Sequence, residues 1–281
     1  MSRSTKDTSG ICKMCLQPRQ LQSSHLIPKA LYKNVNHPEH KPVALRGDFL
    51  LPTDRQTQAY LLCRHCEDIL NKGGEMWIGN KLFSPEGGGF PLYEMLLAEG
   101  ILEHSERGLS VYSTVKSPQL QAEKLVHFGL GLFWKAAVHS WRGDKTDSLI
   151  DLGPFAETIR RWLHGEDGFP SNVYLTTILA HPENALAELR EPYETRDSPS
   201  QGWHMFMMHL CGLFFMLHVG KRVEEIMRVL CTQNNPGRLI CISTYFAIQN
   251  REFLAGELQR ARKTQAYQKA REKIRKERFK G

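Results

Sequence analysis

Two short cysteine motifs, CKMC at residues 12–15 and CRHC at residues 63–66, decide how the N-terminal part of this chain is expected to fold. Each motif places two thiols three positions apart, so that a tight turn can aim both sulfurs at one ion. Together they supply a complete tetrahedral shell for Zn(II), with no open position for water. We therefore predict a structural zinc bound by Cys12, Cys15, Cys63 and Cys66. The alternatives are two unrelated thiol pairs or a redox-active CxxC, although no thioredoxin-like pattern surrounds either motif.

The segment between the two motifs gives this zinc unit a potential function. Residues 16–62 form a gap of 47 residues, far too long for a minimal zinc ribbon, so the two halves of the site must clasp an inserted substructure. Within it lies SSHLIPKALYK, residues 23–33. A neutral imidazole titrates near neutral pH and can accept a proton from water, which makes His25 a candidate general base. The alternative is a histidine with no chemical role in a zinc-stabilised fold.

Composition places the chain among globular proteins without a membrane span. With 281 residues and 41% hydrophobic composition it can bury a sizeable core, as one large domain or two modest ones. The most apolar window, residues 204–219, is too short to cross a membrane and contains three histidines. No signal or transit peptide is visible, so we expect a cytoplasmic protein. The count of seven cysteines is odd and argues against a disulfide framework, which leaves Cys211, Cys231 and Cys241 as expected core residues.

The positive charge of the chain is concentrated at its C-terminal end. The net charge is +7, and residues 251–281 hold 11 Lys and Arg against 4 Glu, which leaves 26 charges of each sign in the rest of the chain. Such a basic arm is compatible with a polyanionic partner such as nucleic acid, whose binding it would make dependent on salt. A solvated terminal helix explains the same charges equally well.

The pattern of breakers and apolar residues predicts an α+β fold. Residues 11–95 favour short strands and loops, with one helix that starts near Cys63 and stops at the double glycine of residues 73–74. Residues 96–195 are expected to be a helical region, although residues 171–181 fit a strand or a helix. Residues 196–250 predict an α+β region with a hairpin that turns at Cys211 and Gly212, and residues 251–281 predict a basic helix or tail.

The order of CxxC, His-Leu-Ile-Pro and a second CxxC at a helix start resembles the HNH (ββα-metal) endonucleases over about residues 11–80. The resemblance implies a treble-clef zinc domain. It also implies His25 as the general base, Gln58 at the position of the asparagine that orients it, and Ser24 and Glu67 at the positions that bind a catalytic Mg(II) or Mn(II).

Three of these four positions depart from the usual residues of the family. Ser24 stands where the family has Asp or His, and a hydroxyl is a weaker ligand for a hard cation than a carboxylate. Gln58 keeps the amide of an asparagine on a longer side chain. Glu67 replaces the usual His or Asn with a carboxylate, which is a good ligand for a hard cation.

The resemblance implies a metal-dependent endonuclease that hydrolyses phosphodiesters, and we expect DNA rather than RNA as the substrate. Lys29 and Lys33 follow His25 and would put positive charge beside a phosphate near the base, although ordinary surface lysines explain them equally well. The resemblance also implies a nuclease of a bacterial defence system or a mobile element. The alternative is a catalytically degenerate, zinc-stabilised module that binds nucleic acid or protein. A protein partner or an oligomer remains compatible with both. A small-molecule enzyme has no motif behind it, since the chain contains no Gly-rich phosphate loop, GxSxG or HExxH.

Overall fold

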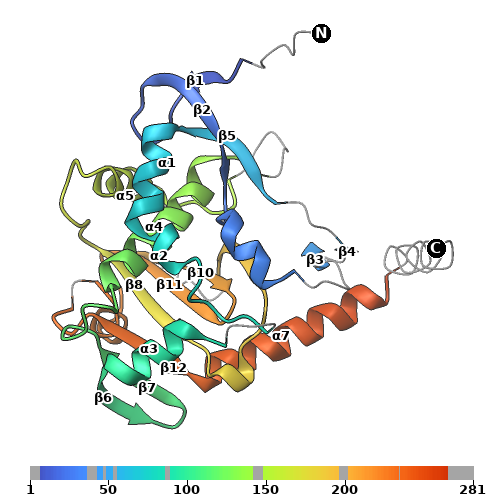
Figure 1. Ribbon diagram of the computed structural model, residues 1–281, viewed down its shortest axis with the longest axis vertical. Coiled ribbons are helices and arrows are strands. Elements are labelled where there is room, and N and C mark those ends of the chain that lie inside the picture. Colours follow the sequence, from blue (N-terminus) through green and yellow to red (C-terminus); the bar gives the residue numbers. More distant parts are fainter. Residues whose placement is uncertain are drawn as a thin grey trace.

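A seven-stranded mixed sheet is built from the chain after residue 100 (Figure 1). The computed structural model describes residues 7–36, 43–46, 49–52, 56–85, 89–141, 148–195, 202–233 and 235–264. The strands, in spatial order, are β6 (Ile101–Glu106), β7 (Leu109–Ser113), β12 (Leu239–Ser243), β8 (Val173–Leu179), β11 (Leu213–Gly220), β10 (Trp203–Leu210) and β9 (Leu189–Glu194). Neighbouring strands are antiparallel except β12 and β8, which are parallel.

A smaller antiparallel sheet carries the two cysteine motifs. It consists of β1 (Ser9–Ile11), β2 (Pro18–His25) and β5 (Gln58–Cys63), in that spatial order. The CKMC motif forms the turn between β1 and β2, and β5 runs directly into helix α1 (Arg64–Leu70). The segment between β2 and β5 contains the 3₁₀ helix η1 (Lys29–Asn34) and the hairpin of β3 (Val43–Arg46) and β4 (Phe49–Pro52).

Helix α4 (Ala122–Val138) joins the small sheet to the large one (Figure 1). It contacts α1, β8, β9 and α5 (Phe155–Leu163), and most of its side chains are buried. One continuous hydrophobic core therefore runs from Cys12 beside the small sheet through α4 to Phe215 in β11. The remaining helical elements are η2 (Asn71–Glu75), α2 (Met76–Ile78), α3 (Pro91–Glu99), η3 (Pro182–Asn184), α6 (Glu225–Val229) and α7 (Thr244–Arg262).

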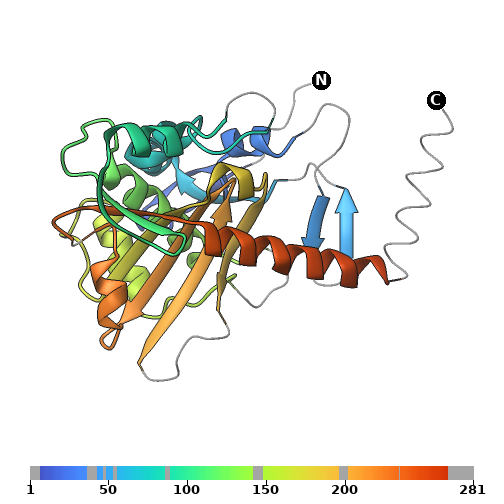
Figure 2. The same ribbon diagram turned by 90° about the horizontal axis from the view of Figure 1, so that it is seen from below.

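The other face of the large sheet has its own smaller core. Phe214 and Met216 of β11 alternate with residues of the first core, as the period of a strand requires, and lie with Ala247 of α7. Helix α7 then extends beyond the sheet and contacts β4, as Figure 2 shows. No helix among the described residues combines the length and the apolar composition that a membrane crossing needs.

The α+β prediction and the hairpin are confirmed. Strands β10 and β11 pair over their full length, and Cys211 and Gly212 between them have φ angles of 47° and 81°, the left-handed values that a two-residue hairpin turn favours. The ambiguous segment 171–181 contains strand β8. Cys211, Cys231 and Cys241 are buried, as expected.

Two predicted regions differ from the structure or extend past its described part. Residues 96–195 were expected to be helical, but they contribute β6, β7, β8 and β9 as well as α4 and α5. The strands were missed because short strands separated by polar turns leave little periodicity in the sequence. Of the basic segment 251–281, residues 251–262 belong to α7, which begins at Thr244, and residues 265–281 lie outside the described part of the chain.

The first helix does not stop at the double glycine. It continues from α1 through the π-helical turn η2 into α2. A Cβ atom on Gly73 would lie 2.2 Å from the ring of His127, and one on Gly74 would lie 2.3 Å from the carbonyl oxygen of Lys124. Both glycines are therefore required for the close approach of α4, and packing rather than backbone conformation explains them.

Gly74→Ala is expected to destabilise the protein by about 2 to 3 kcal/mol, because the added methyl group must push α4 away from η2. Gly256→Ala is the matched control, since Gly256 is also helical and a Cβ there would meet no atom within 4 Å. It should be neutral or stabilising by up to about 1 kcal/mol. Urea denaturation of the two variants measures the difference, and equal midpoints would contradict the packing explanation.

A buried histidine in β11 makes stability depend on pH. His218 is 0% exposed, packs beside the Trp203 ring, and neither of its ring nitrogens has a hydrogen-bond partner among the described residues. Burial lowers its pKa from 6.5 to about 4. The unfolded chain therefore takes up this proton first, and stability falls as pH falls from 6.5 toward 4.

His218→Leu is expected to remove this contribution. Between pH 8 and pH 5 the free energy of unfolding should fall by about 2 kcal/mol more in the wild type than in the variant. Urea midpoints at the two pH values measure it. His104→Leu is the control, since the His104 side chain is exposed. Parallel pH dependence of the wild type and His218→Leu would show that His218 is solvated.

Candidate metal centre and the cavity beside His25

The four predicted zinc ligands lie together. The Sγ atoms of Cys12, Cys15, Cys63 and Cys66 are all within 4.8 Å of one another, and those of Cys15 and Cys63 are 4.0 Å apart. A tetrahedral zinc–thiolate site requires sulfurs about 3.8 Å apart, given a zinc–sulfur bond of about 2.3 Å. The four thiols could therefore hold an ion such as zinc. Among the described residues they are the one cluster of three or more Cys, His, Asp or Glu side chains suited to a metal.

The backbone around the cysteines supports the binding of a cation by thiolates. The amide of Cys63 donates a hydrogen bond to the Sγ of Cys12 over 3.3 Å. The pKa of Cys12 is lowered and that of Cys66 raised, because the two sulfurs share one proton through a hydrogen bond. A divalent cation would replace that proton and neutralise the thiolates.

Helix α5 braces the first cysteine turn from outside. The buried guanidinium of Arg160 donates to the carbonyl oxygen of Met14 over 2.6 Å, between the first two cysteines. It also binds the carboxylates of Glu157 and Glu166, each through two hydrogen bonds. The position of the CKMC turn therefore depends on the helical part of the chain.

His25 is the last residue of β2 and its side chain is partly buried. Its backbone pairs with Gln58 in β5, and the amide of the next residue, Leu26, donates to the carbonyl of Thr57 over 2.9 Å. Burial, with the charges of Lys135 and Lys29, lowers the pKa of His25, while a hydrogen bond with Gln56 and the charge of Glu75 oppose this. The lowered pKa favours the neutral imidazole, the form that can accept a proton.

The hydroxyl of Ser24 is bonded to the carboxylate of Glu67. Ser24 is 2% exposed, its Oγ donates to Oε1 of Glu67 and accepts a hydrogen bond from the amide of Leu62 over 3.3 Å. Burial raises the pKa of Glu67, and the Ser24 hydrogen bond and Lys135 act in the opposite direction. The structure thus brings these two predicted metal ligands together, with the serine holding the carboxylate that α1 supplies.

Gln58 lies on the same side of the sheet as His25 but its described hydrogen bond is to another residue. Its Oε1 accepts a hydrogen bond from the Oγ of Ser23 over 3.3 Å. The amide side chain bonded to the His25 ring is that of Gln56, two positions earlier. The role predicted for Gln58 stays a prediction, and Gln56 is a candidate that the spacing of the family motif did not indicate.

His25 and Glu67 line a common cavity of about 520 Å³. It is lined by Ser23, His25, Pro28, Lys29, Ala30, Lys33, Glu67, Asn71, Glu75, Met76, Gly79 and Asn80. Glu67, Asn71 and Glu75 follow one another at intervals of four along α1 and η2 and so share one helix face. The cavity therefore has an imidazole from β2, two carboxylates from the helix, and Lys29 and Lys33 from η1.

Two charged residues at this site were not among the predicted site residues. Glu75 reaches the cavity because the helix continues through Gly73 and Gly74. Lys135 on α4 is 2% exposed and its Nζ lies 2.9 Å from Oε1 of Glu75 and 3.0 Å from the carbonyl oxygen of His25. The one sequence signal for Lys135 is a lysine inside the apolar run GLFWKAAV.

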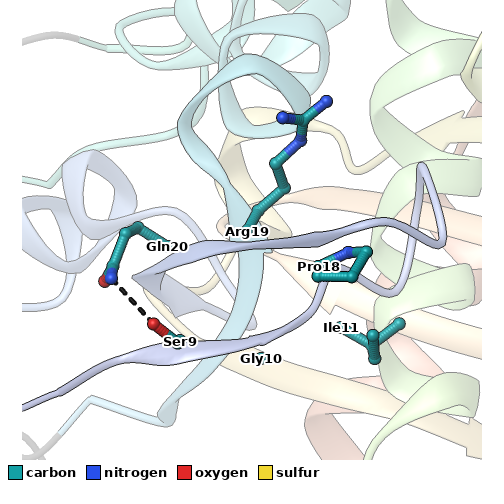
Figure 3. A pocket seen from close by; sticks show the side chains of 6 residues that line it. All are labelled: Ser9, Gly10, Ile11, Pro18, Arg19 and Gln20. Carbon is teal, nitrogen blue, oxygen red and sulfur yellow. Dashed lines mark hydrogen bonds between the residues drawn. The ribbon is translucent and has the colours of Figure 1, made fainter.

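A second hollow is lined by residues of β1 and β2 (Figure 3). Its volume is about 480 Å³ and it is lined by Ser9, Gly10, Ile11, Pro18, Arg19 and Gln20. Gln20 donates to the Oγ of Ser9 over 2.8 Å, and Arg19 points away from that pair in Figure 3. Because this lining has no carboxylate, thiol or imidazole, the cavity beside His25 is the better candidate for chemistry.

The thiols, the imidazole and the carboxylates of the candidate site are thus described from this structure alone. Comparison with known proteins adds no identification, because no protein-family model, no curated protein and no solved structure matches the chain significantly.

Proposed function

We propose that this chain is a metal-dependent nuclease of the HNH type, with His25 as the general base for phosphodiester hydrolysis. The observation that carries the proposal is the shared cavity of His25 and Glu67, with the helix that bears Glu67 beginning at the cysteine cluster. The turn between β1 and β2, the β2–β5 pair and a helix that starts at the second CxxC fit the treble clef that the resemblance implies.

The chemistry follows from the side chains around the cavity. The neutral imidazole of His25 takes a proton from a water molecule as the water oxygen attacks the phosphorus atom. The P–O bond to the leaving oxygen breaks, and that oxygen takes a proton from solvent. Lys29 and Lys33, which are exposed and line the cavity, hold the phosphate by charge. The family chemistry also needs a divalent ion, which would stabilise negative charge on the phosphate and the leaving oxygen.

In this proposal the divalent ion would be Mg(II) or Mn(II), bound by one carboxylate of the chain and otherwise by water and phosphate. Mg(II) is often held by one or two carboxylates together with substrate phosphates and several waters. Glu67 supplies one carboxylate, oriented by Ser24, and Glu75 lines the same cavity. Glu75 is already bound to Lys135, so Glu67 is the proposed ligand.

The proposal is tested by incubating the purified protein with plasmid DNA, linear duplex DNA, single-stranded DNA and RNA, each with Mg(II) or Mn(II). We expect cleavage of at least one substrate that depends on the divalent ion, with DNA favoured over RNA. Absence of cleavage from all eight combinations, with intact zinc content, would overturn the proposal.

A second candidate function is a zinc-stabilised module that binds nucleic acid without cutting it. The hydrogen bond of Ser24 to Glu67 favours it, since that hydroxyl is already engaged where the family has a metal ligand. This candidate predicts binding without cleavage, and no heat of Mg(II) or Mn(II) binding by calorimetry. Truncation before residue 251 should also reduce the dependence of binding on salt.

A further inference from the structure

A buried lysine from helix α4, Lys135, lies directly behind the candidate base. Lys135 belongs to α4, and its neighbours Phe133, Trp134 and Ala136 are 0% exposed. Burying an ammonium group is costly unless its hydrogen bonds are satisfied, and an apolar residue of similar size would serve packing alone better. The charge of Lys135 therefore points to a purpose other than stability.

The contacts of Lys135 lead to two residues that line the cavity. Its Nζ donates to the backbone carbonyl of His25 over 3.0 Å and to Oε1 of Glu75 over 2.9 Å. Lys135 does not itself line the cavity, whereas His25 and Glu75 do. Lys135 can therefore act on a reaction there through its hydrogen bonds to these two residues and through its charge, which also acts on Glu67.

The backbone of His25 is held on both sides. The residue ends the β2–β5 ladder, and the amide of Leu26 that follows it donates to the carbonyl of Thr57. The His25 carbonyl between them is held by Lys135. These bonds fix the peptide plane, and with it the direction of the Cα–Cβ bond from which the imidazole projects.

Glu75 lies at the end of the π-helical turn η2, and this turn places it beside Lys135. The π turn η2 brings Glu75 to the cavity and to Lys135, and π turns occur frequently at functional sites. Gly73 and Gly74 within it allow α4 to approach, since side chains there would collide with His127 and with the backbone of Lys124. Glu75 is 16% exposed at its side chain and Lys135 is 3% exposed, so the ion pair lies between the core and the cavity.

We propose that Lys135 and Glu75 form a positioning pair that sets the orientation of the His25 imidazole in the cavity. The proposal rests on the proposed function, because it assigns a purpose to that orientation. Helix α4 also packs on the large sheet through β8 and β9, so the pair links the site to the rest of the fold.

The test uses Lys135→Met, which keeps the length of the side chain and removes its hydrogen bonds and charge. Lys124→Met, the same change on the same helix, is the matched control. In a cleavage assay we expect kcat to fall about 10- to 100-fold in Lys135→Met with KM changed less than about 2-fold, and to be unchanged in Lys124→Met. Glu75→Gln should show the same loss, and the double variant no further loss, because the two residues act as one unit.

A spectroscopic readout separates positioning from general stability. The ¹⁵N signals of the His25 imidazole, in protein labelled at histidine, are expected to shift in Lys135→Met and to stay in place in Lys124→Met. A wild-type kcat in Lys135→Met, or unchanged His25 ring signals, would overturn the positioning pair. Should Lys135→Met fail to fold, Glu75→Gln, whose side chain is the more exposed of the two, carries the same test.

Failure of the two proposals can be told apart. If the wild type cleaves and Lys135→Met cleaves equally well, the positioning pair is wrong and the nuclease proposal stands. If the wild type cleaves nothing, the nuclease proposal is wrong, and the ring signals of His25 alone decide whether Lys135 orients the imidazole.

Discussion

Cys66→Ser is expected to abolish zinc binding and to unfold the unit that carries His25. Structural zinc in small domains contributes about 10 to 16 kcal/mol, which is comparable with the whole stability of a typical domain. Cys66 is 0% exposed and belongs to the same core as α4 and β11. Unfolding of the cysteine-bearing unit should therefore also destabilise the large sheet. Metal analysis should fall from one zinc per chain to none, and thermal unfolding should begin far below that of the wild type.

Cys231→Ser is the matched control for this change. Its Sγ lies outside the metal cluster and within hydrogen-bond distance of the carbonyl oxygens of Arg228 and Gln233, to either of which a thiol or a hydroxyl can donate its one hydrogen. One zinc per chain and a nearly unchanged melting temperature are therefore expected. Retention of one zinc and of wild-type stability by Cys66→Ser would mean that the four cysteines do not share an ion.

His25→Ala is expected to reduce cleavage about 10²- to 10⁴-fold, the range that general base catalysis contributes. The fold should survive, because the His25 side chain is only partly buried at the cavity. The hydrogen bonds from the Leu26 amide to the Thr57 carbonyl and from Lys135 to the His25 carbonyl do not involve the imidazole. Initial rates with Mg(II) and Mn(II), measured beside the zinc content of the same preparation, give the comparison.

His65→Ala is the control for His25→Ala, since His65 lies inside the CRHC motif with an exposed side chain. It should cleave at the wild-type rate and keep one zinc per chain. A larger loss of activity in His65→Ala than in His25→Ala would place the base elsewhere in the zinc unit.

The cysteine site could be predicted because each pair of its ligands lies within four consecutive residues. Two CxxC turns each fix a pair of sulfurs, and only the meeting of the pairs depends on the fold. The hairpin at Cys211 and Gly212 was accessible for the same reason, since a short turn between apolar runs sets both strands. The approach of Ser24 and Glu67 followed from the family motif, because both lie within the small sheet and its helix.

The features that prediction missed depend on long-range packing. Gly73 and Gly74 look like a helix stop in the sequence, but they accommodate α4, which starts about 50 residues later. The ion pair of Glu75 and Lys135 joins the same two segments. Gln56 is hydrogen-bonded to the imidazole although the family motif did not indicate it, and the register of β2 and β5 shifts between Gln22 and Ser23, an irregularity that residue spacing does not indicate.

The most direct test is one preparation of wild type and His25→Ala, analysed for zinc and assayed on the same nucleic acid with Mg(II) or Mn(II). The account predicts one zinc per chain in both proteins and metal-dependent cleavage by the wild type alone. Equal cleavage by both proteins, or no cleavage by a wild type that contains its zinc, would contradict it.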